Sequence, residues 1–119
     1  FWLQKLSTMK IEQHDNYVVL ADDRGAYSDF APFVSEQVIQ HYKGKNVVID
    51  LLKYTHISLE ELLELLEVSN AHRSRKNSFV IINDAINPDD IPAELVVVPT
   101  EQEAADIIEM EEIERDLGF

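Results

Sequence analysis

Two short runs of β-branched residues, separated by a helix-like stretch, constrain the fold of this chain most strongly. Asn46–Leu51 and Ser78–Ile82 are apolar without alternation, which is typical of strands that are covered on both faces. A helix pattern lies between them, from Ser58 to Lys76. Strands that alternate with helices pair in parallel through crossover connections. The sequence therefore predicts an α/β fold around a mostly parallel sheet.

The helix between these two runs carries clear signals at both of its ends. Ser58 and Glu61 form a capping-box pattern at its start. An apolar stripe follows, which consists of Leu59, Leu62, Leu63 and Leu66, with Leu65 and Val68 beside it. Acidic residues crowd the N-terminal half and basic residues close the other end, an arrangement that complements the helix dipole.

Further elements are predicted on either side of this unit. They are the strands Lys10–His14, Tyr17–Ala21 and Leu95–Val98, the helices Asp29–Lys43 and Thr100–Leu117, and the turn-rich segment 83–94. Asp15-Asn16 predicts a tight turn between the first two strands, which makes the first an antiparallel edge strand. We expect the order β-β-α-β-α-β-(turn)-β-α, with four to five strands and the helices packed on the sheet.

The chain is strongly acidic, with 23 Asp and Glu against 10 Lys and Arg and a net charge of −13. This balance argues against direct nucleic-acid binding, because that affinity rests on Lys and Arg at phosphates. It equally disfavours docking on anionic membranes. Residues 100–119 hold eight acids and one base, so this block alone carries −7. Such a block predicts either a solvated helix face or an acidic docking element.

Length and composition bound the domain organisation. No window approaches the roughly 18 apolar residues of a membrane span, and the lack of cysteine excludes disulfides and thiolate chemistry. We expect one cytoplasmic domain over residues 9–119, a monomer or weak dimer that needs no cofactor and no metal. Met9 can serve as its start, so we interpret residues 1–8 as an upstream extension or a remnant of cloning.

Residues that could carry chemistry are sparse. The four histidines lie far apart in the sequence, without a zinc-binding spacing, and three glycines make no phosphate-binding loop. Asp22, Asp50 and Asp84 follow predicted strands, where open α/β sheets bind ligands. Three carboxylates there could hold Mg²⁺, as in a phosphoacceptor receiver domain. The last strand, however, lacks the lysine that such a site needs.

One segment suggests a family. Asn46-Val-Val-Ile-Asp-Leu-Leu-Lys-Tyr-Thr-His-Ile-Ser-Leu-Glu-Glu-Leu62 resembles the core of STAS domains, the sulfate-transporter and anti-sigma-factor-antagonist fold. Ser78–Ile82 and Val96–Ala104 are similar to that family's later strand and its closing strand-to-helix step. The resemblance covers residues 9–108. It implies a STAS-like fold and a non-enzymatic module that binds a regulatory protein, either an anti-sigma factor or a kinase-like protein.

The resemblance also implies a position for a regulatory switch. In STAS proteins an Asp-Ser-Ser-Gly-like segment opens the second helix, and a partner kinase phosphorylates its second serine. That segment falls here on Ser58-Leu59-Glu60-Glu61, so Glu60 occupies the phosphoacceptor position. A glutamate imitates at best one fixed negative charge. The resemblance therefore implies a degenerate phosphoacceptor site. Capping explains Ser58, with modification of Ser58 as the alternative.

A narrower resemblance points to a second reading. Residues 107–119, together with Asp50-Leu-Leu-Lys53, are similar to small bacterial STAS-like proteins that commonly carry the label ribonuclease Z. That enzyme is a zinc phosphodiesterase with a His-x-His-x-Asp-His motif, which this sequence lacks. The alternatives are thus an accessory protein that binds the ribonuclease and an RNA-processing hydrolase.

We expect a protein partner to contact two surfaces. The candidate residues are Ser58, Glu60, Glu61, Glu64 and Glu67 on the capped helix, and Met110, Ile113 and Leu117 on the C-terminal tail. The four glutamates have no lysine four positions later, and together they suggest a use in steering toward a basic partner. For any one of them, a solvated helix face is the alternative interpretation. The apolar tail residues, with Phe119, are predicted to pack back on the sheet. Docking in a partner's groove is the alternative.

Overall fold

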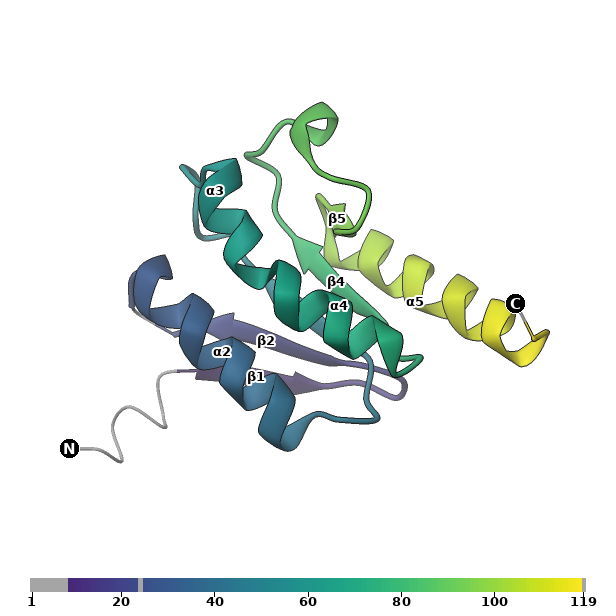
Figure 1. Ribbon diagram of the computed structural model, residues 1–119. Helices are drawn as coiled ribbons and strands as arrows, with labels where there is room; N and C mark the ends of the chain where they lie inside the picture. The colour runs from purple at the N-terminus through teal and green to yellow at the C-terminus, as the bar shows by residue number, and fades with distance from the viewer. Residues whose placement is uncertain (1–8, 24, 119) are drawn as a thin grey trace.

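A five-stranded sheet with the order β1-β2-β3-β4-β5 forms the centre of the computed structural model, which describes residues 9–23 and 25–118 (Figure 1). The strands are β1 (Met9–Gln13), β2 (Val18–Asp22), β3 (Val47–Asp50), β4 (Phe79–Ile82) and β5 (Val97–Val98). β1 pairs antiparallel with β2, and every later pair is parallel. The predicted α/β fold, with a mostly parallel sheet and an antiparallel edge strand, is confirmed. Residues 1–8, which the sequence sets apart, lie outside the described residues.

Helices cover both faces of this sheet. The helical elements are α2 (Tyr27–His41), α3 (Leu59–Leu62), the 3-10 turn η1 (Leu63–Leu65), α4 (Leu66–Ser74), the 3-10 turn η2 (Pro88–Asp90) and α5 (Glu101–Asp116). α2 and the α3–η1–α4 run lie on one face, and α5 lies on the other (Figure 1). The single helix predicted between the two central strands is therefore three consecutive pieces.

The central strands are buried because both of their faces are covered. In β3, Val47 and Ile49 face α2 and α4, whereas Val48 faces α5. All three side chains are fully buried, and β4 shows the same division. The absence of alternation in these two runs thus reports two apolar layers, as the sequence predicts.

Local signals fix the connections. The His14 N–H donates a hydrogen bond of 2.9 Å to the Tyr17 carbonyl, which closes the predicted two-residue turn at Asp15-Asn16. At the start of α5, the Thr100 hydroxyl accepts a hydrogen bond from the Glu103 N–H at 3.1 Å. The predicted cap of the last helix is therefore present.

α5 packs on the sheet through a different stripe from the one expected. Ala104 and Ile108 are fully buried against it, whereas Met110, Ile113 and Leu117 are 51%, 53% and 67% exposed. The prediction that these three residues pack back on the sheet is wrong. At about 100° per residue they lie on the opposite side of the helix from Ala104 and Ile108. Phe119, the fourth residue of that prediction, lies outside the described residues.

Candidate functional site

A buried carboxylate organises the edge of the sheet where the parallel strands end. Asp22, the last residue of β2, accepts hydrogen bonds from Tyr54 Oη at 2.5 Å and from the Gly25 N–H at 3.0 Å. Lys53 Nζ lies 3.5 Å from the same carboxylate. Both Lys53 and Tyr54 belong to the loop that follows β3, so Asp22 ties that loop to its neighbouring strand.

These contacts set the ionisation of the pair. Burial by itself would raise the pKa of Asp22, but the hydrogen bonds from Tyr54 and Gly25 and the charge of Lys53 outweigh it, so its pKa is lowered. Burial, reinforced by the Asp22 carboxylate, raises the pKa of the Tyr54 phenol. Asp22 is therefore held as a carboxylate and Tyr54 as its neutral donor.

Asn83 performs a similar task one strand further along. Its side-chain NH₂ donates to the Leu51 carbonyl at 2.9 Å and to the Tyr54 carbonyl at 3.1 Å. Its side-chain oxygen accepts from the N–H groups of Ala85 and Ile86. One buried amide thus holds the loops after β3 and β4 together. Hydrogen bonds from side chains therefore hold the strand ends and loops at this edge of the sheet in place.

The start of α3, which follows the loop after β3, is fixed by hydrogen bonds of its own. Ser58 Oγ accepts from the Glu61 N–H at 3.1 Å, and Glu61 Oε1 accepts from the Ser58 N–H at 2.9 Å. The predicted capping box is therefore present. Tyr27 Oη donates to the Glu61 carbonyl at 2.6 Å, which joins α3 to α2. Local capping and one long-range hydrogen bond together fix this helix start.

The structure separates the predicted partner-binding residues into two surfaces. Ser58, Glu60, Glu64 and Glu67 are exposed along the α3–η1–α4 run, whereas Glu61 is half-buried and serves the cap. Met110, Ile113 and Leu117 lie on α5, which covers the other face of the sheet. The two predicted groups therefore do not form one continuous site.

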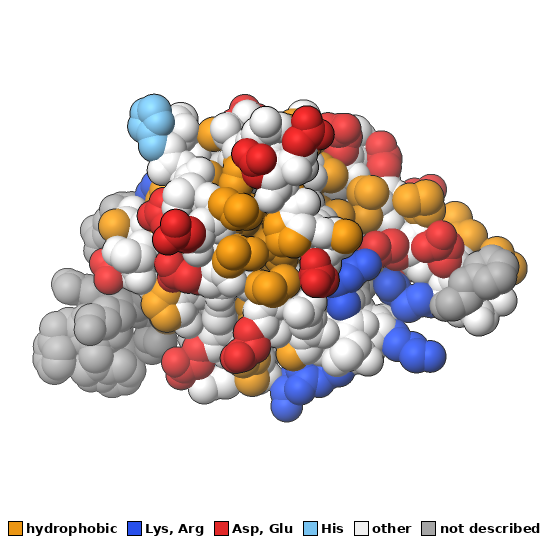
Figure 2. Space-filling model, turned by 45° about the horizontal axis from the view of Figure 1, so that its top comes forward, with side chains coloured by type: hydrophobic (Ala, Val, Ile, Leu, Met, Phe, Trp, Pro, Cys, Tyr) orange, Lys and Arg blue, Asp and Glu red, His pale blue; other side chains and the backbone are white. Residues whose placement is uncertain are grey.

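Apolar surface lies next to the acidic helix. Leu63 is 37% exposed, and the partly buried Leu66, Ile86 and Ile91 pack at the margin of the core. Figure 2, which brings the α3 end of the molecule forward, shows hydrophobic side chains in the middle of this face with acidic side chains around them. An apolar centre with a charged rim is the usual anatomy of a protein-binding surface.

The strand-end carboxylates do not assemble the magnesium site considered from the sequence. Asp22 is engaged as described, Asp50 Oδ1 accepts from the Leu52 N–H at 3.0 Å, and Asp84 is exposed. Among residues 9–23 and 25–118, one group of three potential ligands comes together, Glu12, His14 and Glu101. His14 Nε2 lies 2.6 Å from Glu12 and 3.3 Å from Glu101, so these groups satisfy one another.

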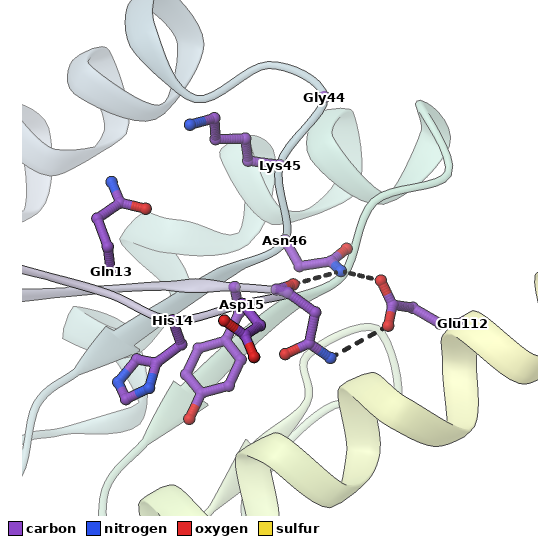
Figure 3. A pocket seen from close by; sticks show the side chains of 9 residues that line it. Gln13, His14, Asp15, Gly44, Lys45, Asn46 and Glu112 are labelled. Carbon is purple, nitrogen blue, oxygen red and sulfur yellow. Dashed lines mark hydrogen bonds between the residues drawn. The ribbon is translucent and has the colours of Figure 1, made fainter.

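Sequence reasoning missed a polar cluster at the opposite edge, where the parallel strands begin (Figure 3). Asn46 is buried, and its NH₂ donates to Glu112 Oε2 and to the Asn16 carbonyl, each at 2.9 Å. Its side-chain oxygen accepts from the Ser78 N–H at 2.8 Å. The asparagine just before a buried strand was the available signal. Its hydrogen-bond partner, Glu112, lies 66 residues later in an acidic helix, and nothing in the sequence indicates that the two residues meet.

Glu111 completes this cluster. Its carboxylate accepts from Arg73 Nη2 at 2.7 Å and from Ser78 Oγ at 2.5 Å. Burial alone would raise the pKa of Glu111, but these hydrogen bonds and the charges of Arg73 and Arg115 lower it. Two acids of the C-terminal block, Glu111 and Glu112, are therefore internal hydrogen-bond acceptors that fasten α5 to the sheet.

Of the comparisons with known proteins, only the one with solved structures bears on the fold. No family model matches the sequence, and no curated protein matches it. Among solved structures, the chain is similar to Moorella thermoacetica RsbS S58E, in which the residue number is that protein's own. The TM-score is 0.61 and the identity 18%, over 87% of this chain and 96% of that one.

This match also bears on the resemblances drawn from the sequence. It gives no support to the label ribonuclease Z. Within the described residues, no helix has the length and apolar character needed to cross a membrane. The arrangement of strands and helices, together with the structural match, shows that this chain has a STAS-like fold.

Proposed function

We propose that this protein is a STAS-type regulatory module that binds a protein partner and catalyses no reaction. The observation that carries the proposal is the fixed start of α3, which presents the exposed carboxylates of Glu60, Glu64 and Glu67 beside an apolar margin. A rigid helix start loses little conformational freedom when a partner docks on it. The partner that we propose is an anti-sigma factor or a kinase-like protein.

Electrostatics supports a basic partner surface. Within the described part of the chain, none of these three carboxylates forms an ion pair. Like charges spaced three and four positions apart on a helix repel one another, which costs some helix stability. The same uncompensated charge attracts a basic surface and speeds its association.

We further propose that Glu60 makes this site a degenerate phosphoacceptor. Glu60 lies in the first turn of α3, where a negative charge is favoured by the exposed N–H groups of the helix. A phosphate there would be added and removed by other enzymes, whereas the carboxylate is permanent. The module would therefore keep one binding state. Ser58 Oγ accepts the capping hydrogen bond, and this role accounts for a serine at this position without phosphorylation.

Affinity capture with matched charge variants tests this proposal. The test variant is Glu60→Gln/Glu64→Gln/Glu67→Gln. The control is Glu12→Gln/Asp15→Asn/Glu36→Gln, which removes three exposed charges from β1, the hairpin turn and α2, outside both proposed contact surfaces. We expect the wild-type protein and the control to capture the same partner, and the test variant to lose it. Equal capture by both variants would exclude the α3 surface. Equal loss would show that total charge, and not this helix, decides binding.

The identity of the captured protein separates the remaining alternatives. An anti-sigma factor or kinase-like protein agrees with the proposal, whereas a zinc ribonuclease would make this chain an accessory subunit of that enzyme. The hydrolase alternative requires metal-dependent RNA cleavage by the purified protein that disappears with Asp50→Asn or Asp84→Asn. We expect no such cleavage.

The outer stripe of α5 is a second proposed contact. Met110, Ile113 and Leu117 form one exposed apolar row on the side of the helix that faces away from the sheet. Such a row at helical spacing fits a groove on another protein. The capture assay applies to it directly, with Met110→Gln/Ile113→Gln/Leu117→Gln as the bait.

A further inference from the structure

The few basic residues of this acidic chain are concentrated at one edge of the sheet. Six of the ten Lys and Arg residues lie in segments at or near the edge where the parallel strands begin, namely Lys43, Lys45, Arg73, Arg75, Lys76 and Arg115. Figure 2 shows most of the Lys and Arg side chains in view at the lower right, whereas acidic side chains lie on the left, along the top and directly beside this basic group. This edge therefore differs in charge from the surface of the proposed function.

A hollow of about 260 Å³ lies within this basic region. It is lined by Arg73, Lys76, Asn77, Arg115 and Gly118, which are three cations and two neutral residues. The hollow is thus formed by the end of α4 and the last turns of α5. In a protein with a net charge of −13, a concave surface with this lining is not expected from composition.

Two of these three cations form no ion pair among the described residues, although the charge of Arg115 also acts on Glu111. Arg115 donates to the neutral acceptors Ser78 Oγ and Asn46 Oδ1, each at 3.3 Å, and Lys76 forms no ion pair. Arg73 is paired with Glu111 at 2.7 Å. The three cations that line this hollow, together with the Glu111 carboxylate that pairs with Arg73, carry a charge of +2.

The backbone at Lys76 is a second and independent observation. Lys76 has a φ of 65°, in the left-handed region, and follows Arg75, the C-cap residue of α4. Helices commonly end with such a residue, but it is ordinarily Gly or Asn, because a larger side chain is strained there. A lysine at this position places a cation at the hollow at the expense of backbone strain, which is a pattern found at binding sites.

We propose that this hollow binds the phosphate group of a small phosphorylated molecule, with Arg73, Lys76 and Arg115 as its cationic ligands. Guanidinium groups match phosphate oxygens in pairs, and the lysine adds a mobile point charge. A phosphate dianion balances the excess of two positive charges. An adjoining hollow shares Lys76, Asn77 and Arg115 but is also lined by Glu112 and Asp116, which repel an anion. The phosphate therefore lies on the Arg73 and Gly118 side.

Titration with inorganic phosphate and with pyrophosphate, followed by NMR at constant ionic strength, tests the proposal. We expect saturable shifts of the backbone amides of Lys76 and Asn77 and of the Arg73 and Arg115 side chains, at lower concentration for pyrophosphate. Chloride at the same ionic strength is expected to cause no saturable shift. Shifts that grow in proportion to the phosphate concentration, or that spread over the basic edge, would overturn the site.

A single substitution separates binding from folding. Lys76→Gly removes the cation and relieves the left-handed strain, so we expect a melting temperature equal to or above that of the wild type and at least tenfold weaker phosphate binding. The control is Lys43→Ala, which removes a cation from the same edge outside the hollow and is expected to leave binding unchanged. Wild-type affinity in Lys76→Gly would overturn the proposal, as would equal weakening in both variants.

The acidic surface of a second copy is the competing occupant of this hollow. If it were seated there, the Lys76 and Arg115 signals would change with protein concentration in phosphate-free buffer, and the apparent mass in sedimentation would rise with them. We expect neither change, because two copies of charge −13 repel each other. Concentration-dependent shifts at these residues would overturn the phosphate proposal.

Discussion

Tyr54 and Asp22, which lie 32 residues apart in the sequence, are joined by a hydrogen bond of 2.5 Å between the phenol oxygen and the carboxylate. The Tyr54 ring also meets the Tyr27 ring edge-on, with 5.4 Å between the ring centres. Tyr27 in turn donates its hydroxyl to the Glu61 carbonyl in α3. A continuous series of contacts therefore runs from the buried end of β2 to the helix that carries the proposed partner site.

Removal of the Tyr54 hydroxyl is expected to weaken this series at its first step. Tyr54→Phe leaves the buried Asp22 carboxylate with fewer donors, so the free energy of unfolding should fall by about 1–3 kcal/mol. Urea unfolding at neutral pH measures the loss. The control is Tyr42→Phe, since the Tyr42 hydroxyl makes no hydrogen bond to another described residue, and we expect it to cost less than about 0.5 kcal/mol. Equal losses in the two variants would mean that the Asp22 contact is not stabilising.

Acid is expected to destabilise the fold through the same carboxylate. The pKa values of Asp22 and Glu111 are lowered in the folded protein, so the unfolded chain binds these protons more readily. Their contribution is complete above the pKa of an unfolded carboxyl group, about 4, and is lost as the pH falls through the folded values. Unfolding free energies measured from pH 7 down to pH 3 should therefore decrease, and Asp22→Asn should flatten the decrease. An unchanged slope in that variant would assign the acid sensitivity to other groups.

The hydrophobic pattern of the sequence was sufficient to predict the central strands and the helix between them. The unbroken apolar runs at β3 and β4 reported strands covered on both faces, and the capping pattern at Ser58 located the start of α3 to the residue. The start of α2 was less accurate, at Asp29 instead of Tyr27, because its N-cap is Ala26, which offers no side-chain hydrogen bond. Local chemistry, where it exists, leaves a local signal.

Long-range polar contacts left no such signal. The sheet-facing stripe of α5 begins with Ala104 and Ile108 and continues through Glu111 and Arg115, so its second half is polar. The other side of the helix carries an apolar row at helical spacing, Met110, Ile113 and Leu117. The sequence pattern predicts that this row is the buried one. Which row faces the sheet is decided by Asn46 and Ser78, whose proximity to α5 exists only in the folded chain.

The capping box of α3 predicts a measurable local contribution. Ser58→Ala removes the acceptor for the Glu61 N–H, and we expect a loss of about 1 kcal/mol in the free energy of unfolding. Ser58→Asp keeps an acceptor at the N-cap and should restore most of that loss, which urea unfolding of the three proteins would measure. If Ser58→Asp is as unstable as Ser58→Ala, the cap does not contribute as the geometry indicates.

Substitutions in the two rows of α5 should differ in how much they change the free energy of unfolding. Met110→Gln, Ile113→Gln and Leu117→Gln change exposed side chains, so each should alter the free energy of unfolding by less than about 0.5 kcal/mol. Ile108→Ala leaves a cavity against the sheet and should cost about 2–5 kcal/mol. Thermal and urea unfolding of the single variants would distinguish the rows.

Truncation after Glu109 is expected to destabilise the fold more than substitution of the exposed row Met110, Ile113 and Leu117 does. It removes Glu111, Glu112 and Arg115 together with their hydrogen bonds to Asn46, Ser78 and Arg73, so we expect a clear fall in melting temperature. Glu111→Gln in the full-length chain should reproduce part of that fall, because an uncharged amide cannot pair with Arg73 as the carboxylate does. A truncated chain as stable as the full one would mean that the polar cluster contributes nothing, and α5 would then be held by Ala104 and Ile108 alone.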